Sequence, residues 1–253
     1  VVPAGESYAG RGYDLEIGAD SAIDTIVKVT IEERKTSGEM NGVSWQLTDD
    51  GTLTIDGEDL QQAKGEDGFY IWISFQQETK KLVLGKQVTT IPYDAFEDFR
   101  MVESLELPEG LKKIGSYAFS GCKKLKDVVL PSSLKTIEGR AFKGCGFKGI
   151  KVPESVEDIG TSALGYNEHE SSINGFYIIG KSGSKAEAYA NENNINFIDK
   201  DNPVVPISSC DVKVPKYAFY EGTDVIPSVQ VSFNSEKLVE GTDYTLAYEN
   251  NHT

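Results

Sequence analysis

The chain has 253 residues, of which 39% are hydrophobic and 26% charged, and its formal net charge is −15. The acidity lies in the two ends, because residues 81–170 hold equal numbers of acidic and basic side chains. Such a surface disfavours nucleic acid and anionic lipid as partners, and no apolar run reaches the roughly 18 residues that a membrane-spanning helix needs.

Residues 1–42 predict a small N-terminal β region whose role the sequence does not indicate. Stretches at 13–17 and 23–31 alternate apolar and polar residues, and this alternation is typical of a strand with one buried face.

Residues 43–80 predict a cap for the segment that follows. Two alternating runs flank Asp49-Asp50-Gly51, which favours a hairpin because glycine accepts the positive φ of a tight turn. The inner face of this hairpin would carry Trp45, Leu47, Leu53 and Ile55. The apolar run Phe69–Phe75 is the second candidate for covering the first turn of an array.

One short sequence motif occurs four times between Leu82 and about Gly180, and its clearest copy is LKKIGSYAFSGCKKLKDVVLP at Leu111–Pro131. A shift of 23 residues, or 22 for the last copy, brings like residues into register. The predicted structural columns are Ile91, Ile114, Ile137 and Ile159, then Phe96, Phe119, Phe142 and Leu164, then Cys122 and Cys145. A fixed period in this range predicts a solenoid, in which each unit buries its apolar face against the next.

Each repeat predicts a short strand and a turn-rich return. In LKDVVLP the alternation points Leu125, Val128 and Leu130 inward, and proline then ends the strand because it cannot donate to a ladder. We expect the phenylalanines to stack ring on ring. Cys122 and Cys145 are expected to be free, buried thiols, since equivalent side chains of stacked turns lie about 4.8 Å apart, too far for a disulfide.

The segment after the repeats predicts a closing cap and a further domain. Ser184 and Glu187 have the spacing of a capping box, and the helix expected over 184–193 places Ala186, Tyr189 and Ala190 on one face. A short strand is expected at 195–198. The polar, proline-containing stretch at 201–206 is typical of a linker.

These motifs resemble the BspA-like leucine-rich-repeat proteins of bacterial cell surfaces. The pattern LxxIxxxAFxxCxxLxxVxLP carries the resemblance, supported by WQLTDDGTLTIDG upstream and GKSGSKAEAYANENNINFI downstream. The resemblance implies a mainly β fold with short helical and turn segments: a right-handed leucine-rich-repeat solenoid over residues 81–200, flanked by small β regions. Residues 207–253 resemble the opening strands of an immunoglobulin-like domain, which is expected to be truncated at Thr253.

The sequence indicates neither an enzyme nor a cofactor. His169 lies in a polar loop and His252 near the end, and no nucleophile, phosphate-binding or zinc-binding motif accompanies them. Acidic clusters at 49–50, 56–59 and 199–202 leave calcium open as an alternative. None of them matches an EF-hand, and turns favour the same residues.

Function is therefore expected on the outward positions of the repeat strands. By alternation these are Ser104, Glu106, Asp127, Val129, Gly149, Lys151, Tyr177 and Ile179. The resemblance implies a non-enzymatic, secreted or surface-attached adhesion protein, whose repeat face binds a host or microbial surface protein or a glycan. The alternative is a passive spacer or an accessory module of a larger multidomain surface enzyme.

Overall fold

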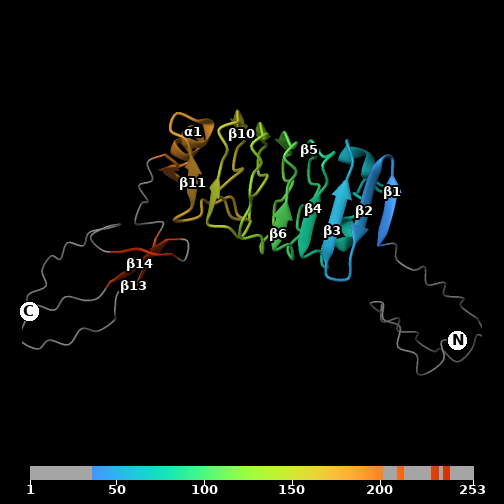
Figure 1. The fold of residues 1–253 in the computed structure, drawn as a ribbon, viewed down its shortest axis with the longest axis horizontal. Coiled ribbons are helices and arrows are strands. Elements are labelled where there is room, and N and C mark those ends of the chain that lie inside the picture. The colour runs from blue at the N-terminus through green and yellow to red at the C-terminus, as the bar shows by residue number, and fades with distance from the viewer. Residues whose placement is uncertain (1–35, 202–209, 214–228, 234–235, 240–253) are drawn as a thin grey trace, which may run out of the picture. The chain divides into compact units, whose positions relative to one another are not determined.

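The computed structural model describes residues 36–201, 210–213, 229–233 and 236–239 (Figure 1), all within the unit Lys35–Thr253. The strands predicted at 13–17 and 23–31 lie outside these residues, as do most of the linker and of the immunoglobulin-like domain predicted for 207–253.

The described chain is mainly β, with short parallel ladders along the repeats (Figure 1). One sheet contains β1 (Ser37–Met40), β2 (Val43–Leu47), β3 (Thr52–Asp56), β4 (Lys81–Leu84) and β6 (Ser104–Glu106), in that order. A second contains β10 (Asp158–Ile159), β8 (Thr136–Ile137), β7 (Lys113–Ile114) and β5 (Thr90–Ile91). A third contains β12 (Asn196–Asp199), β11 (Tyr177–Gly180) and β9 (Gly149–Lys151). Beyond residue 201, β13 (Asp211–Lys213), β14 (Gln230–Phe233) and β15 (Glu236–Lys237) pair antiparallel.

Each repeat is one turn of chain that hydrogen-bonds to the next turn at equivalent positions. The amides of Phe96 and Phe119 donate to the carbonyls of Ala118 and Ala141, at 2.9 and 2.8 Å. Strands β5, β7 and β8 pair parallel with the isoleucine column in register. The period found in the sequence is therefore the length of one stacked turn.

The predicted columns form the interior of the stack. Ile91, Ile114 and Ile137 are buried, and Ile159 is partly buried where it packs against the core. The predicted phenylalanine stack is confirmed: Phe119 lies between Phe96 and Phe142, with ring centroids 5.5 and 5.3 Å away and planes within 16°. Burial of these apolar rings is the main favourable term in the stability of the array.

The cysteine column has a polar role inside this apolar stack. The thiols of Cys122 and Cys145 donate to the carbonyls of Phe96 and Phe119 in the preceding turn, at 3.5 and 3.2 Å. Both are free thiols, as expected, and burial raises the pKa of Cys145 well above its ordinary value. A buried thiol of this kind is a packing group and a poor nucleophile.

The hairpin predicted at residues 44–55 is formed by β2 and β3, with Leu47 opposite Leu53. Gly51 has φ +85° in the turn. Leu53 and Ile55 are fully buried, whereas Trp45 is only partly buried because its ring lies across Gly38 of β1. β3 then pairs parallel with β4, so the hairpin continues the sheet of the repeats.

Side chains of the segment 70–76 replace the backbone donors that a preceding turn would supply. They hydrogen-bond to alternate carbonyls of the first turn: Tyr70 to Tyr93, Trp72 to Ala95 and Gln76 to Glu97, at 3.1, 2.8 and 2.8 Å. Trp72 also stacks on Phe96 and Tyr70 on Trp72, which extends the ring column by two members. Except for that of Gln76, these contacts come from the segment Phe69–Phe75 predicted as a cover, and 3₁₀ turns lie at Leu60–Ala63 and Ile73–Phe75.

Helix α1 (Lys185–Glu192) closes the other end with its buried face of Ala186, Tyr189 and Ala190, as predicted. The phenol oxygen of Tyr189 accepts from the amide of Leu164 at 3.1 Å and donates to the carbonyl of Leu164 at 2.9 Å. One hydroxyl therefore satisfies both backbone groups that the next turn would have satisfied. Burial raises the pKa of Tyr189 to about 12, which keeps the phenol protonated and able to donate.

The capping box predicted at the start of α1 is not formed. Glu187 reaches back and accepts from the amide of Gly183 at 2.6 Å, but the hydroxyl of Ser184 makes no capping bond and has no partner. The expected reciprocal pair was therefore wrong, because the carboxylate binds one residue earlier than the box requires.

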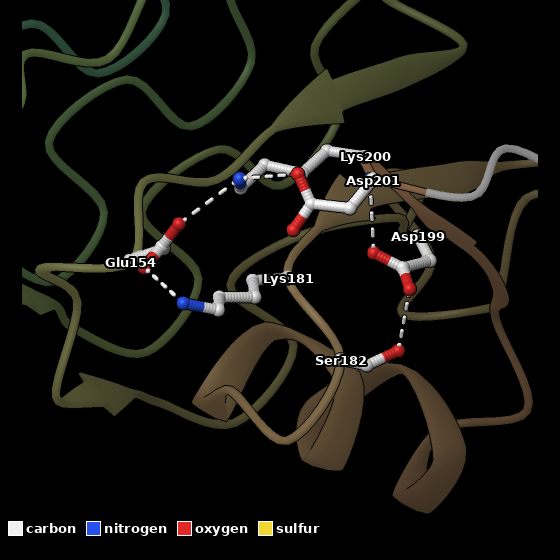
Figure 2. Close-up of polar contacts among 6 residues, drawn as sticks. All are labelled: Glu154, Lys181, Ser182, Asp199, Lys200 and Asp201. Atoms are coloured by element: carbon white, nitrogen blue, oxygen red, sulfur yellow. Dashed lines mark hydrogen bonds and ion pairs between the residues drawn. The ribbon is translucent and has the colours of Figure 1, made fainter.

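A group of charged residues, which we call the C-terminal latch, joins the last repeat to the closing cap (Figure 2). Glu154 accepts from Lys181 at 3.0 Å and pairs with Lys200 at 3.1 Å. Asp199, at the end of β12, accepts from the Ser182 hydroxyl and from the amide of Asp201, at 2.9 and 3.1 Å (Figure 2). The latch therefore links three segments that are distant in sequence.

Protonation of the latch carboxylates in acid is expected to lower the stability of the array. Hydrogen bonds from Lys181 and Lys200 lower the pKa of Glu154 below 4.5, and bonds from Asp201 and Ser182 lower that of Asp199 below 3.8. A carboxyl with a lowered folded pKa stabilises the fold above its unfolded pKa, and this contribution is lost as pH falls through the folded value. Glu154→Gln should lower the melting temperature at pH 7, and this deficit should shrink towards pH 3.

Glu192→Gln is the matched control for Glu154→Gln, since Glu192 is exposed in α1 and forms no ion pair among the described residues. Equal melting curves for the two variants from pH 7 to pH 3 would contradict a stabilising role for the latch.

Candidate functional site

The candidate site is the strand face, which we define as the eight outward positions predicted above. They lie on β6, on residues 126–130 of the next turn, on β9 and on β11. The strand pairing places Gly149 beside Tyr177 and Lys151 beside Ile179. The alternation therefore brings these four positions together in two neighbouring pairs.

The exposed part of the strand face is a mixture of polar side chains around one apolar one. Ser104, Glu106, Asp127 and Lys151 are exposed, and the Glu106 carboxylate pairs with Lys81 at 2.5 Å. Val129 is the most exposed large apolar side chain in the described residues, at 76%. An exposed valine among fixed polar neighbours is a contact point that a protein partner can desolvate.

The strand predicted at residues 125–130 is not formed, although its burial pattern is as expected. Val128 and Leu130 are buried and Val129 exposed, yet among the described residues no hydrogen bond involves 126–130. The turn that contains residues 126–130 bonds to the following turn just before this segment, where the amide of Gly146 donates to the carbonyl of Leu125 at 3.0 Å. The strand face is therefore divided between two sheets, with Val129 in the gap.

Tyr177 and Ile179 were predicted to be open to a ligand, and for Tyr177 this was wrong. Tyr177 is only 7% exposed, and Ile179 is partly buried. Gly149 lies beside Tyr177 across the ladder and leaves room for the Tyr177 ring, which a β-carbon at position 149 would overlap. The accessible face therefore ends at Lys151.

The face also extends further towards the N-terminal cap than the prediction placed it. Thr54 of β3 is paired with Val83 of β4, and Val83 is paired with Glu106 of β6. Thr54 is exposed and Val83 partly so. The alternation of apolar and polar residues in TLTID and KLVL indicates that Thr54 and Val83 point outward. The prediction placed TLTID in the cap hairpin and KLVL at the start of the repeats, and so did not join the two into one face.

The other candidate groups serve turns. The acidic side chains at 50 and 59 accept hydrogen bonds from nearby groups. Asp50 accepts from the Thr48 hydroxyl and from the amide of Thr52, and these bonds lower the pKa of Asp50. Asp59 accepts from the amide of Gln61. His169 is exposed, and its backbone amide donates to Asn167. Within the described residues no group of three or more metal-ligating side chains is found. The same part of the chain contains no helix long and apolar enough to cross a membrane.

Comparison with known proteins identifies the repeats. Residues 74–171 match the family model for the BspA type leucine rich repeat region, in six copies. This segment is a BspA-type leucine-rich-repeat region. The match begins upstream of the four copies predicted from Leu82, so the BspA-type region includes part of the segment assigned to the cap. No curated protein matches the chain.

Solved structures of bacterial leucine-rich-repeat proteins are similar to the chain over about half its length. A leucine-rich-repeat protein of T. pallidum is 24% identical, with a TM-score of 0.39, and the match covers 56% of this chain and 70% of that one. One from Bacteroides ovatus is 28% identical, with a TM-score of 0.35, covering 51% and 40%. A leucine-rich cell surface protein of Faecalibacterium prausnitzii is 20% identical, with a TM-score of 0.28, covering 52% and 52%.

Proposed function

We propose that this chain is a non-enzymatic binding protein, secreted or attached to a bacterial cell surface, that engages a protein partner through the strand face. The BspA-type region supports an interaction role, and the similar protein from Faecalibacterium prausnitzii is described as a cell surface protein. On this proposal residues 81–200 form a right-handed solenoid.

The observation that carries the proposal is the contrast between the fixed interior and the changing face. The turns bury the same residue types at the isoleucine and phenylalanine columns, while the outward positions hold a serine, acids, a lysine and the exposed Val129. The interior columns serve stacking, so the outward positions remain available for a partner. Val129 lies between the sheet that contains β6 and the sheet that contains β9, with the buried Val128 and Leu130 on either side of it.

A charge placed at the centre of the face should weaken this binding. Val129→Asp in the full chain is expected to weaken binding to immobilised extracellular-matrix proteins or microbial surface proteins at least about tenfold, because the contact would bury an unpaired carboxylate. Binding is measured by surface plasmon resonance over a fixed panel of such proteins. The melting temperature should stay unchanged, since position 129 is exposed.

Phe69→Asp is the matched control, because it places the same charge at another exposed apolar residue that lies outside the strand face. If Val129→Asp binds like the unsubstituted chain, the strand face is not the binding surface. If no panel member binds the unsubstituted chain, the spacer role is favoured; the side-chain caps at both ends of the stack would suit a self-contained spacer.

A further inference from the structure

A second surface lies on the turns that follow β5, β7 and β8, away from the strand face. We call it the turn ridge: Tyr93, Tyr117, Arg140 and Lys143. Tyr93 is 55% exposed, and its ring meets that of Tyr117 edge to face, with centroids 5.7 Å apart and planes at 63°. Tyr117 is partly buried, so the pair presents the ring of Tyr93 to solvent and supports it from one side.

The ridge is held in place before any ligand arrives. The Arg140 guanidinium lies 5.6 Å from the centre of the Tyr117 ring, and the Lys143 ammonium 5.5 Å. Glu170 fixes Arg140 with two contacts, at 2.6 and 3.2 Å, and pairs with Lys143 at 3.6 Å. The Tyr117 ring is packed in this way, and Tyr93 rests against it. Tyr93 therefore loses less freedom when a ligand binds, which favours affinity.

Two residues of the turn ridge have an unfavourable backbone conformation. Tyr117 and Arg140 both have left-handed backbones, with φ 59° and 60°. Residues other than glycine adopt this region rarely. The neighbouring turns have the same geometry at Asp94 and Ser162, so the repeat sets the conformation, and the identity of the side chain there is free to vary.

Charge balance indicates what the ridge can bind. Arg140 and Lys143 are paired with Glu170, and Lys64 next to the ridge is paired with Asp94 at 3.6 Å. Glu170 carries one charge against Arg140 and Lys143, and Glu97, whose carboxyl also feels Lys143, supplies a second. Three carboxylates therefore balance the three cations, which leaves little attraction for an acidic polymer. The ridge offers an aromatic face for apolar contact, and beside it Asp94 and a partly buried Glu97 offer oxygen acceptors.

We propose that the turn ridge binds a neutral glycan, with the apolar face of one sugar ring on Tyr93 and hydroxyl groups donating to Asp94 and Glu97. A sugar presents an apolar ring face and a rim of hydroxyls, so it matches a tyrosine platform bordered by carboxylates and guanidinium. The full chain therefore carries two separate binding surfaces, and failure of one leaves the other intact.

The test is affinity electrophoresis of the full chain in gels containing a neutral polysaccharide, either dextran, mannan or a β-glucan, or an acidic one, hyaluronan. At least one neutral polymer should retard the chain, and hyaluronan should not. Tyr93→Ala should weaken the retardation about tenfold, as expected for loss of a central aromatic contact. Tyr93→Phe should retain most of it, because the ring remains.

Phe69→Ala serves as the matched control here, since Phe69 is an exposed ring outside the turn ridge, and the melting temperature of each variant reports whether it folds. Retardation by none of the neutral polymers, retardation by hyaluronan instead, or an unchanged response in folded Tyr93→Ala would each overturn the proposal. Binding that Val129→Asp removes and Tyr93→Ala leaves would also overturn it, because the sugar would then sit on the strand face.

Discussion

Phe119→Ala is expected to destabilise the array by roughly 3 to 5 kcal/mol, the usual cost of removing a buried phenylalanine. The Phe119 ring is 1% exposed and stacks on both sides, so its loss breaks two ring contacts and leaves a cavity at the middle of the column. For a chain of this size such a loss lowers the melting temperature by roughly 10 °C. Thermal unfolding followed by far-ultraviolet circular dichroism measures it.

Two further variants separate stacking from simple burial. Phe119→Leu keeps most of the volume and should cost less than half as much, since the last turn already accommodates Leu164 in this column. Phe69→Ala should cost almost nothing, because Phe69 is 61% exposed. A Phe119→Ala variant that melts within about 2 °C of the unsubstituted chain would contradict the stacking register.

The interior could be predicted from the sequence because a repeat makes burial periodic. Once Phe96, Phe119 and Phe142 were placed in one column, their mutual contact followed from the stacking of identical turns. The same reasoning placed Ala186 and Tyr189 on the buried face of α1. It could not show that the Tyr189 hydroxyl binds Leu164, since backbone groups are the same at every residue and leave no mark in the sequence.

The site was predicted less completely because exposure depends on neighbours in other turns. Alternation correctly turned Val129 outward, but it gave no sign that the ring of Tyr177 would lie against Gly149 and contact Phe233, 5.0 Å away between centroids, and so become buried. It also missed the turn ridge: Tyr93 and Tyr117 belong to columns one residue apart and meet only through the left-handed backbone at Tyr117. Contacts between columns need the stacked geometry, which the period alone does not supply.

Trp72→Ala is expected to unfold the N-terminal end of the array first, with a loss of roughly 3 to 5 kcal/mol. The indole is fully buried, it stacks between Tyr70 and Phe96, and its N–H satisfies the carbonyl of Ala95 at 2.8 Å. In a stack where each turn contacts only its neighbours, loss of the cap exposes the first turn and frays the array from that end. Hydrogen exchange should therefore quicken most at residues 90–99.

The two functions of the indole can be measured separately. Trp72→Phe keeps a ring in the stack but leaves the buried carbonyl of Ala95 without a donor, which costs roughly 1 to 3 kcal/mol. Trp45→Phe is the matched control, since Trp45 is only partly buried and lies in the outer hairpin. If Trp72→Phe and Trp45→Phe unfold alike, the hydrogen bond contributes nothing. The cap would then act by covering apolar surface alone, and side-chain replacement of a missing turn's backbone donors would have to be abandoned as its mechanism.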